Sequence, residues 1–268
     1  MRFLLLALIG HLAVAADFDP PLFVFQNGLR FANLAEESAT LKKLGYAGVG
    51  SAKLPGLEER IAAYKSAGLR VCSIYVGAKV SDTDASFDAG IPKAIELLKG
   101  SGAVVELTLR GKAKTDEQAV AIVREVAELA AAADLKVVLY PHAGFYVARV
   151  PEALRVAKAV DRPNVGIMFN LCHFLKSEKA ADLEKTITEA GPYLFQASTC
   201  GADTDGKNWG ALIQTLEKGS FDQERLFAAL KSVGFSGIVG LQCYAIKGDS
   251  KANLTRSGEA WQALRKSF

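Results

Sequence analysis

The sequence predicts a (β/α)8 barrel, an α/β fold in which eight parallel strands alternate with helices, and three observations support this. Short apolar runs typical of buried strands alternate with longer helix-like runs eight times along the 268 residues. Half of the residues are apolar, and a barrel of roughly 250 residues forms one domain around one core. Polar residues suited to chemistry gather where strand-like runs end, which is where such a barrel places its active site.

Residues 1–16 have the pattern of a secretory signal peptide, and residues 17–268 form the expected barrel domain. A basic start at Met1-Arg2 is followed by an apolar run and by the small-residue pattern Ala13-Val14-Ala15. The apolar run is shorter than the roughly 20 residues that span a bilayer, so a membrane anchor is the weaker interpretation. We therefore expect cleavage near residue 15 or 16, export to the periplasm or the extracellular space, and no membrane association afterwards.

The first half of the domain contains four strand-like runs, and glycines follow the helices between them. The expected strands are Leu22–Phe25, Tyr46–Ser51, Leu69–Val76 and Val104–Leu109. The expected helices, Ala35–Leu44, Leu57–Ala67 and Ile91–Leu98, end before Gly45, Gly68 and Gly100. Glycine is favoured at these positions because it readily adopts the backbone conformation that closes a helix.

The second half continues the same alternation, beginning with a long helix, Asp116–Ala133, that Thr115 is expected to cap. The further strands are Lys136–Tyr140, Val165–Phe169, Leu194–Ser198 and Ile238–Gln242, and the further helices are Pro151–Val160, Ala180–Ala190, Phe221–Val233 and Leu254–Leu264. Near-continuous apolar strands joined by helices indicate a parallel sheet covered by helices. The alternative, an open doubly wound sheet, usually has a glycine-rich turn after its first strand, which residues 26–30 do not supply.

Charge and cysteine content indicate which partners and which disulfides to expect. The net charge of +3 comes from interspersed acidic and basic residues, so no basic stripe indicates a nucleic-acid partner. The four cysteines lie far apart, unlike the dense disulfide frameworks of small secreted domains, and buried thiols are expected. A bridge between Cys172 and Cys200 remains open because their strands should be neighbours.

Polar side chains follow four consecutive strands of the expected barrel. These segments are Tyr140-Pro141-His142, Asn170-Leu171-Cys172-His173, the strand containing Gln196 and Ser198, and Gln242-Cys243-Tyr244. Residues two apart in a strand share a face, so Tyr140 pairs with His142, and Gln242 with Tyr244. We expect these side chains to converge on one pocket.

Two of these segments carry a resemblance to a known family. Residues 163–173, PNVGIMFNLCH, and the segment Tyr140-Pro141-His142 resemble the strand-six and strand-five segments of the xylose-isomerase-like barrels. This family contains sugar isomerases and epimerases, together with inosose dehydratases and relatives of endonuclease IV. The resemblance covers nearly all of the chain after the signal, and it implies a sugar or keto-sugar as the small-molecule ligand.

The chain departs from the family at the metal ligands. Metal-dependent members hold a divalent cation with Glu, Asp, His and Glu from strands five to eight, and the matching residues here are Tyr140, Asn170, Gln196 and Gln242. Neutral amides coordinate weakly and offset none of the cation's charge. No cofactor is therefore expected. If a divalent metal is bound, His142 and His173, with Cys172, are its expected ligands.

The same residues suit a metal-free sugar site. Asn170, Gln196 and Gln242 offer donors and acceptors that match sugar hydroxyls, although they would equally satisfy buried strand ends. His142 and His173 are the candidate acid and base, because imidazole titrates near neutral pH and can move a proton at a carbon beside a carbonyl. The resemblance supports His173 as well.

Other candidates for ligand binding lie nearby in the expected barrel. Arg110 is suited to holding an anionic or enolate oxygen, or else forms an internal ion pair with Glu106. In the polar loop 199–209, Asp203 is suited to sugar hydroxyls and Trp209 to stacking on a sugar face, unless this is a plain surface loop. Lys247, after the last strand, is a further candidate that is equally suited to a structural role.

Two hypotheses for the function follow. The first is an exported sugar isomerase or epimerase that transfers protons at carbon, with isomerisation, epimerisation and elimination or hydration as possible outcomes. The second is a non-catalytic carbohydrate-binding barrel that has lost its metal site. A nuclease activity is disfavoured because it needs a cluster of metal-binding acids and histidines. The sequence makes no prediction of oligomeric state.

Overall fold

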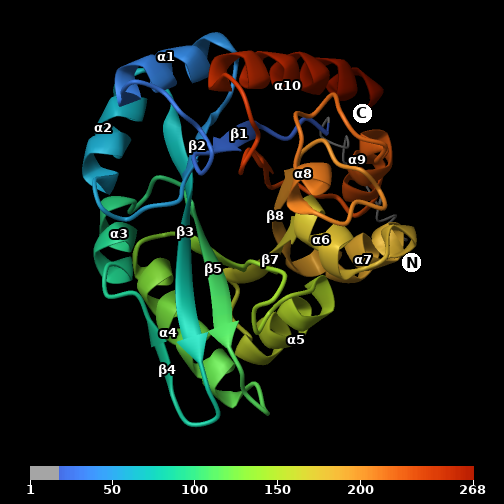
Figure 1. Cartoon of the computed structure of the whole chain (residues 1–268). Helices are drawn as coiled ribbons and strands as arrows, with labels where there is room; N and C mark the ends of the chain where they lie inside the picture. Colours follow the sequence, from blue (N-terminus) through green and yellow to red (C-terminus); the bar gives the residue numbers. More distant parts are fainter. Residues whose placement is uncertain (1–17) are drawn as a thin grey trace, which may run out of the picture.

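The structure is a computed structural model that describes residues 18–268, so the expected signal segment lies outside the described residues. Eight parallel strands form a closed barrel with helices around it (Figure 1), which confirms the predicted fold. The strands are β1 (Leu22–Phe25), β2 (Gly48–Ser51), β3 (Arg70–Val80), β5 (Val104–Gly111), β6 (Lys136–Leu139), β7 (Val165–Asn170), β8 (Leu194–Thr199) and β9 (Ile238–Leu241). Closure comes from β1, which pairs with both β2 and β9.

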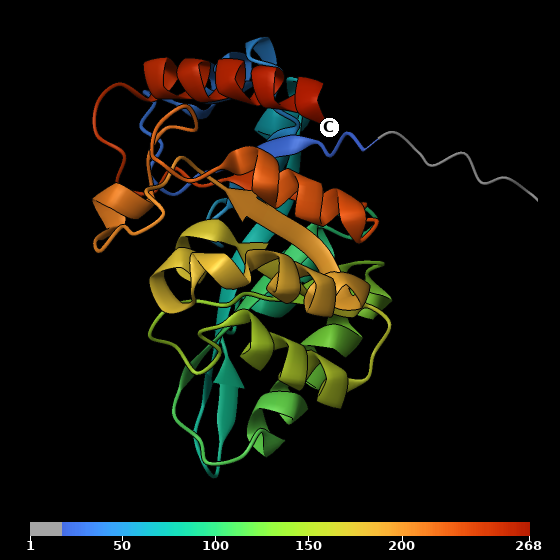
Figure 2. The ribbon, with the colours of Figure 1, turned by 90° about the vertical axis from the view of Figure 1, so that its right-hand side faces the viewer.

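The helices lie outside the strands, as Figure 2 shows from the side. Those that match the expected helices are α1 (Leu34–Lys43), α2 (Leu57–Ser66), α3 (Ile91–Leu97), α4 (Glu117–Ala132), α5 (Val150–Val160), α7 (Leu183–Ala190), α9 (Gln223–Ser232) and α10 (Ser250–Leu264). The predicted N-cap of α4 was wrong, because Asp116 rather than Thr115 occupies it. Within residues 18–268, none of the helices has the length and apolar character needed to cross a bilayer.

The barrel interior is filled by large rings opposite glycines. Phe23 and Phe25 of β1 are buried inside the barrel and meet edge to face, with ring centroids 5.0 Å apart. A Cβ atom at Gly50 of β2 or Gly240 of β9 would lie within 3 Å of these rings. Each strand beside β1 therefore has a glycine where the rings of β1 need room, which is the close packing that protein interiors require.

One side of the barrel extends beyond the rest. β3 and β5 continue past the ends of the neighbouring strands, and β4 (Ala85–Phe87) pairs antiparallel with the end of β3. Figure 1 shows β3 and β5 as the longest arrows, with β4 beside the tip of β3. The sequence did not predict β4 or the full length of β3. The extension carries the inner wall of the barrel outward at the mouth.

All four cysteines are buried free thiols. The Sγ of Cys172 donates to Oδ1 of Asn170 at 3.0 Å, and the Sγ of Cys200 donates to the carbonyl of Leu212 at 3.3 Å. The bridge that the sequence left open between Cys172 and Cys200 is therefore not formed. The expectation of buried thiols is confirmed.

Candidate functional site

A pocket of about 360 Å³ opens at the carboxyl ends of the strands. It is lined mainly by aromatic and polar side chains, namely Phe25, Asn27, Tyr75, Tyr140, His142, His173, Trp209, Gln242 and Tyr244, together with Ala52 and Ile213. Both candidate histidines face it, as do three of the eight candidate binding residues, Tyr140, Trp209 and Gln242. Pockets of this size and character at this face of a barrel are the usual place for a small-molecule site.

The ends of β6 and β7 bring the two histidines together. His142 follows β6, while His173 lies in the first turn of α6 (Leu171–Ser177), a short helix that starts directly after β7. Asn170 begins this helix, because its Oδ1 accepts from the backbone N–H of His173 at 3.3 Å. The two imidazole rings lie with centroids 4.2 Å apart. The sequence predicted their proximity but not the helix that holds His173.

A single residue, Ala143, assigns opposite tautomers to the two imidazoles. Its backbone N–H donates to Nδ1 of His173 at 3.2 Å, so that nitrogen carries a lone pair and the hydrogen of the neutral ring is on Nε2. Its carbonyl lies 3.1 Å from Nδ1 of His142, which must therefore carry a hydrogen and leave Nε2 as the lone pair. In their neutral forms, His142 offers an acceptor at Nε2 and His173 offers a donor at Nε2.

Burial keeps both rings neutral. Loss of solvent, followed by the neighbouring His142, lowers the pKa of His173 to about 3. Loss of solvent is also the largest cause that lowers the pKa of His142, and the positive charge of Arg110 contributes in the same direction. At neutral pH the pocket therefore contains one imidazole suited to accept a proton and one suited to donate a hydrogen bond.

Tyr140 joins the histidines to Asn170. Its phenol oxygen accepts from Nδ2 of Asn170 at 2.6 Å, and its ring lies edge-on to that of His173 at 5.7 Å. Burial raises the pKa of Tyr140 well above its ordinary value, so the phenol remains protonated. Asn170 itself does not line the pocket, because its side chain is engaged with Tyr140, Cys172 and the start of α6. A role for Asn170 in ligand binding stays a prediction, and from this position Asn170 would act through Tyr140.

The two glutamines lie at different depths. Gln196 is fully buried inside the barrel, where its Nε2 donates to the carboxylate of Glu106. Glu106 therefore does not form the ion pair with Arg110 that the sequence left open, and Arg110 stands exposed at the rim. Gln242 lines the pocket, with its Oε1 accepting from the N–H groups of the next two residues, both at 3.1 Å.

The remaining candidates divide between the mouth and the periphery. Trp209 lies in the pocket, edge-on to His173 with ring centroids 5.1 Å apart. Asp203 does not face the pocket, and its Oδ1 instead accepts from the N–H of Ser220 at 3.2 Å, which braces the loop. Lys247 is exposed beside a different surface hollow. The structure thus brings Trp209 to the site and leaves Asp203 and Lys247 outside it.

Sequence reasoning missed one polar group of the pocket wall, Asn27, and expected another, Tyr244. Asn27 lies just after β1, and its Oδ1 is buried without a hydrogen-bond partner among the described residues. Tyr244 is 53% exposed at the mouth. The signal that located the histidines, a polar residue directly after a strand, also applies to Asn27, whose segment was considered only as a phosphate-binding turn.

The residues at the family's metal positions do not fit a divalent cation. The Oδ1 atom of Asn170 is occupied by a thiol and a backbone N–H, and the Oε1 atom of Gln242 by two backbone N–H groups. Tyr140 remains a neutral phenol, and Gln196 lies deeper in the barrel. Among residues 18–268 there is no group of three or more His, Cys, Asp or Glu side chains suited to a metal, including the proposed set with Cys172. These side chains are therefore suited to hydrogen bonding rather than to holding a divalent cation.

Comparisons with solved structures support the fold. The chain is similar to 3-keto-D-glucoside 4-epimerase YcjR from E. coli, with 18% identity, a TM-score of 0.70, and coverage of 92% of this chain and 100% of that one. It is similar to an IolI protein with a bound zinc atom, with 15% identity, a TM-score of 0.72, and coverage of 92% of this chain and 99% of that one. It is also similar to AsbF, a probable 3-DHS dehydratase from Bacillus anthracis, with 14% identity, a TM-score of 0.71, and coverage of 90% of this chain and 98% of that one.

A comparison with curated protein sequences gave no significant match. A sequence profile described as "Xylose isomerase-like TIM barrel" matches residues 38–266, which is most of the chain. This match agrees with the order of the strands and with the position of the pocket. The chain therefore belongs to the xylose isomerase-like TIM barrel family.

Proposed function

We propose that this protein transfers a proton at a carbon atom beside the carbonyl group of a sugar or keto-sugar, using two neutral histidines in place of the family's metal. The observation that carries the proposal is the pair of opposite tautomers that Ala143 imposes on His142 and His173. Solved neighbours that are sugar epimerases support the sugar as substrate class. Isomerisation, epimerisation and elimination all begin with this transfer.

The chemistry follows from the two free nitrogens. The Nε2 lone pair of His142 takes the proton from carbon, and the electron pair of the C–H bond forms the C=C bond of an enolate. The carbonyl oxygen gains negative charge, and the Nε2–H of His173 donates a hydrogen bond to it. A neutral imidazole whose pKa lies far below 7 can polarise a carbonyl in this way without giving up its proton. Return of the proton from His142 to carbon completes the cycle.

The rest of the pocket suits a polyol ring. Trp209 and Tyr75 offer aromatic surface, while Gln242 and Asn27 offer amide groups at the wall. Tyr140 has a phenol hydrogen beyond the bond that it accepts from Asn170. Such a mixture of aromatic faces and a few polar groups is typical of small-molecule sites.

The test is hydrogen exchange at carbon in heavy water. The purified protein is incubated with sugars and 3-keto-sugars, and deuterium in the recovered sugar is measured by NMR and mass spectrometry. Wild-type protein should introduce deuterium at a carbon beside the carbonyl. The substitution His142→Asn keeps a donor toward the carbonyl of Ala143 but removes Nε2, and it should abolish exchange.

Two substitutions of His173 separate its contacts. His173→Asn keeps an acceptor for the N–H of Ala143 and loses the donor to the ligand, whereas His173→Gln can keep a donor at the ligand side. Exchange should fall about a hundredfold in the first and less in the second, since removing one donor to a developing oxyanion costs about that much. Lys247→Ala, outside the pocket, is the control and should match wild type. Exchange that persists in His142→Asn would refute the proposal.

A second function, binding of a carbohydrate without catalysis, is favoured by one observation. No carboxylate lines the pocket among the described residues, whereas proton transfer at carbon commonly uses one. A sugar that binds to wild-type protein but never exchanges its carbon-bound hydrogen would support this alternative. The same heavy-water experiment therefore decides between the two functions.

We also propose that the protein is exported and acts in the periplasm or outside the cell. The support is the signal-like pattern of residues 1–16. N-terminal sequencing of the protein isolated from its source should begin near residue 16 or 17. A mature protein that still carries residues 1–16 would contradict export by cleavage.

A further inference from the structure

A second hollow, of about 610 Å³, adjoins the histidine pocket along the edge of β3. It lies between the loop after β2 and the strand β4, and we call it the β3-edge groove. Its polar wall consists of Lys53, Tyr75, Lys79, Ser86, Asp88 and Arg110. Tyr75 lines both hollows, so the groove and the histidine pocket are neighbours at the barrel mouth. The proposed chemistry does not use this groove.

The groove carries three positive charges that lack ion-pair partners. Lys53, Lys79 and Arg110 form no salt bridge with any residue of the described range 18–268, although most other arginines of the surface do. Lys79 and Arg110 are also direct register partners on β3 and β5. Like charges at adjacent positions of neighbouring strands destabilise a sheet. An anion between them would remove this cost.

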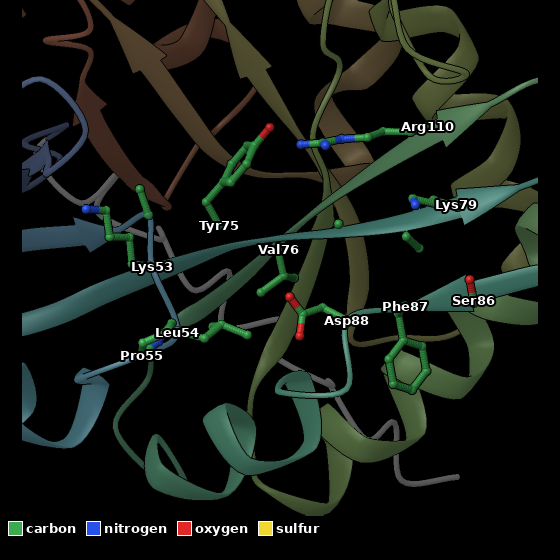
Figure 3. Close-up of a pocket in the computed structure, with 13 residues that line it drawn as sticks. Lys53, Leu54, Pro55, Tyr75, Val76, Lys79, Ser86, Phe87, Asp88 and Arg110 are labelled. Atoms are coloured by element: carbon green, nitrogen blue, oxygen red, sulfur yellow. The ribbon is translucent and has the colours of Figure 1, made fainter.

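The groove itself, at about 610 Å³, has room for such an anion, and Gly77 and Arg110 line its inner side. Gly77 lies between Tyr75 and Lys79 on the same face of β3 and has no side chain, and a Cβ placed there would meet Thr108 at 3.3 Å and Arg110 at 3.9 Å. Figure 3 shows Tyr75 and Arg110 on one side of β3, with the side chain of Arg110 extended toward Tyr75. The guanidinium therefore extends along the barrel mouth toward Tyr75, which borders the histidine pocket.

One carboxylate, that of Asp88, also lines the groove. Its Oδ1 accepts from the N–H of Gly90 at 2.8 Å, at the start of α3. In Figure 3 it lies on the opposite side of β3 from Tyr75 and Arg110. The side of the groove that faces the histidine pocket therefore keeps a positive character.

We propose that the ligand spans both hollows, with its sugar part in the histidine pocket and an attached anionic group, a carboxylate or a phosphate, in the β3-edge groove beside Lys79 and Arg110. The sugar part of this inference rests on the proposed function. The groove then selects acidic or phosphorylated sugars over neutral ones. Lys53 at the outer end contributes attraction at longer range.

The contact between the anion and Arg110 would also affect His142, the proposed base. The guanidinium of Arg110 lies over the ring of Phe145 at 4.7 Å, and that ring stacks on His142 with centroids 3.9 Å apart. The positive charge of Arg110 is one cause of the lowered pKa of His142. An anion bound to Arg110 offsets this charge and makes His142 a stronger base when the correct ligand is present.

The experiment compares matched neutral and anionic sugars by isothermal titration calorimetry. The probes are D-glucose, D-glucuronate and D-glucose 6-phosphate, and in parallel D-fructose and D-fructose 6-phosphate, each at two salt concentrations. The variants are Lys79→Gln and Arg110→Gln, with Lys112→Gln as a control of equal charge change that lies outside the groove. Circular dichroism confirms that each variant is folded.

In at least one series, the anionic member should bind about tenfold more tightly than its neutral partner, because one charge-assisted contact is worth about that factor. The gain should shrink with salt, vanish in Lys79→Gln or Arg110→Gln, and remain in Lys112→Gln. A gain for glucuronate alone identifies a carboxylate, and a gain for the phosphates alone identifies a phosphate. No gain in any series, or a gain that both groove variants retain, would overturn the inference.

Failure of the groove inference can be distinguished from failure of the proposed function. Preferential binding of anionic sugars without deuterium exchange would leave the groove inference standing and refute the proposed catalysis. Deuterium exchange on neutral sugars without any gain for anionic ones would do the reverse.

Discussion

Replacing the buried carboxyl of Glu106 by an amide should change how the stability of the barrel depends on pH. Glu106 is fully buried, and one of its oxygens, Oε2, has no hydrogen-bond partner among the described residues. Burial raises the pKa of Glu106 from 4.5 to about 7. The folded protein therefore holds this proton at pH values where the unfolded chain has already released it.

The sign and the size of the effect follow from linkage. Between pH 4.5 and 7 the folded state binds more protons than the unfolded state, so the free energy of unfolding falls as pH rises through this window. The full loss, reached above pH 7, is about 3 kcal/mol, from 1.36 kcal/mol for each pH unit between the two pKa values. The substitution Glu106→Gln removes the titration and keeps an oxygen for the Nε2 of Gln196.

The assay is urea unfolding followed by tryptophan fluorescence between pH 5 and 8.5. The variant should gain stability relative to wild type as pH rises, by about 3 kcal/mol in total. Glu58→Gln, which removes an exposed carboxylate of α2, is the control and should stay within about 0.5 kcal/mol of wild type. Parallel curves for Glu106→Gln and wild type across this range would refute the reasoning.

Three further predictions concern the pocket and the core. Dialysis against a chelator should leave deuterium exchange unchanged, because the amide oxygens at the family's metal positions are occupied, and a loss that added zinc restores would contradict this. Trp209→Ala should weaken sugar binding three- to tenfold by calorimetry, since an aromatic contact is worth about 1 kcal/mol, and unchanged affinity would remove Trp209 from the site. Tyr46→Phe should lower the free energy of unfolding by about 1 kcal/mol in urea, because the hydroxyl of Tyr46 donates to the carbonyl of Leu254 at 2.7 Å inside the protein; an unchanged midpoint would contradict that contribution.

The order of strands and helices was predictable because buried parallel strands and amphipathic helices leave different apolar patterns. The elements that were missed depend on contacts between distant segments. β4 is only three residues long and is a strand because it pairs with the end of β3. α6 begins inside a segment that continues an apolar strand, where the side chain of Asn170 turns back to the N–H of His173.

Part of the candidate site was predictable from the rule that polar residues directly after the strands of a barrel gather at one pocket. That rule placed Tyr140, His142, His173 and Gln242 at one pocket, and the structure brings them together there. It failed for Gln196, which pairs in register with Ile238 at the base of β9 and so lies a layer deeper than the strand end.

The partners of side chains could not be read from the sequence either. The amide of Asn170 serves the start of α6, and the carboxyl of Glu106 pairs with Gln196 rather than Arg110. The opposite tautomers of the histidines depend on the position of one peptide group, that of Ala143. Such contacts require the folded chain, since their members are brought together by packing and not by spacing.

The most direct test of the histidine pair is a 15N NMR titration of the histidine side chains, with His142→Asn and His173→Asn used for assignment. At pH 7 one ring should be neutral with its hydrogen on Nδ1 (His142) and the other neutral with its hydrogen on Nε2 (His173). Neither should become charged until the pH is below 6.5, and His173 should remain neutral to about pH 3. Two rings with the same tautomer, or a charged His173 near pH 6, would contradict the acid–base arrangement on which the proposed function rests.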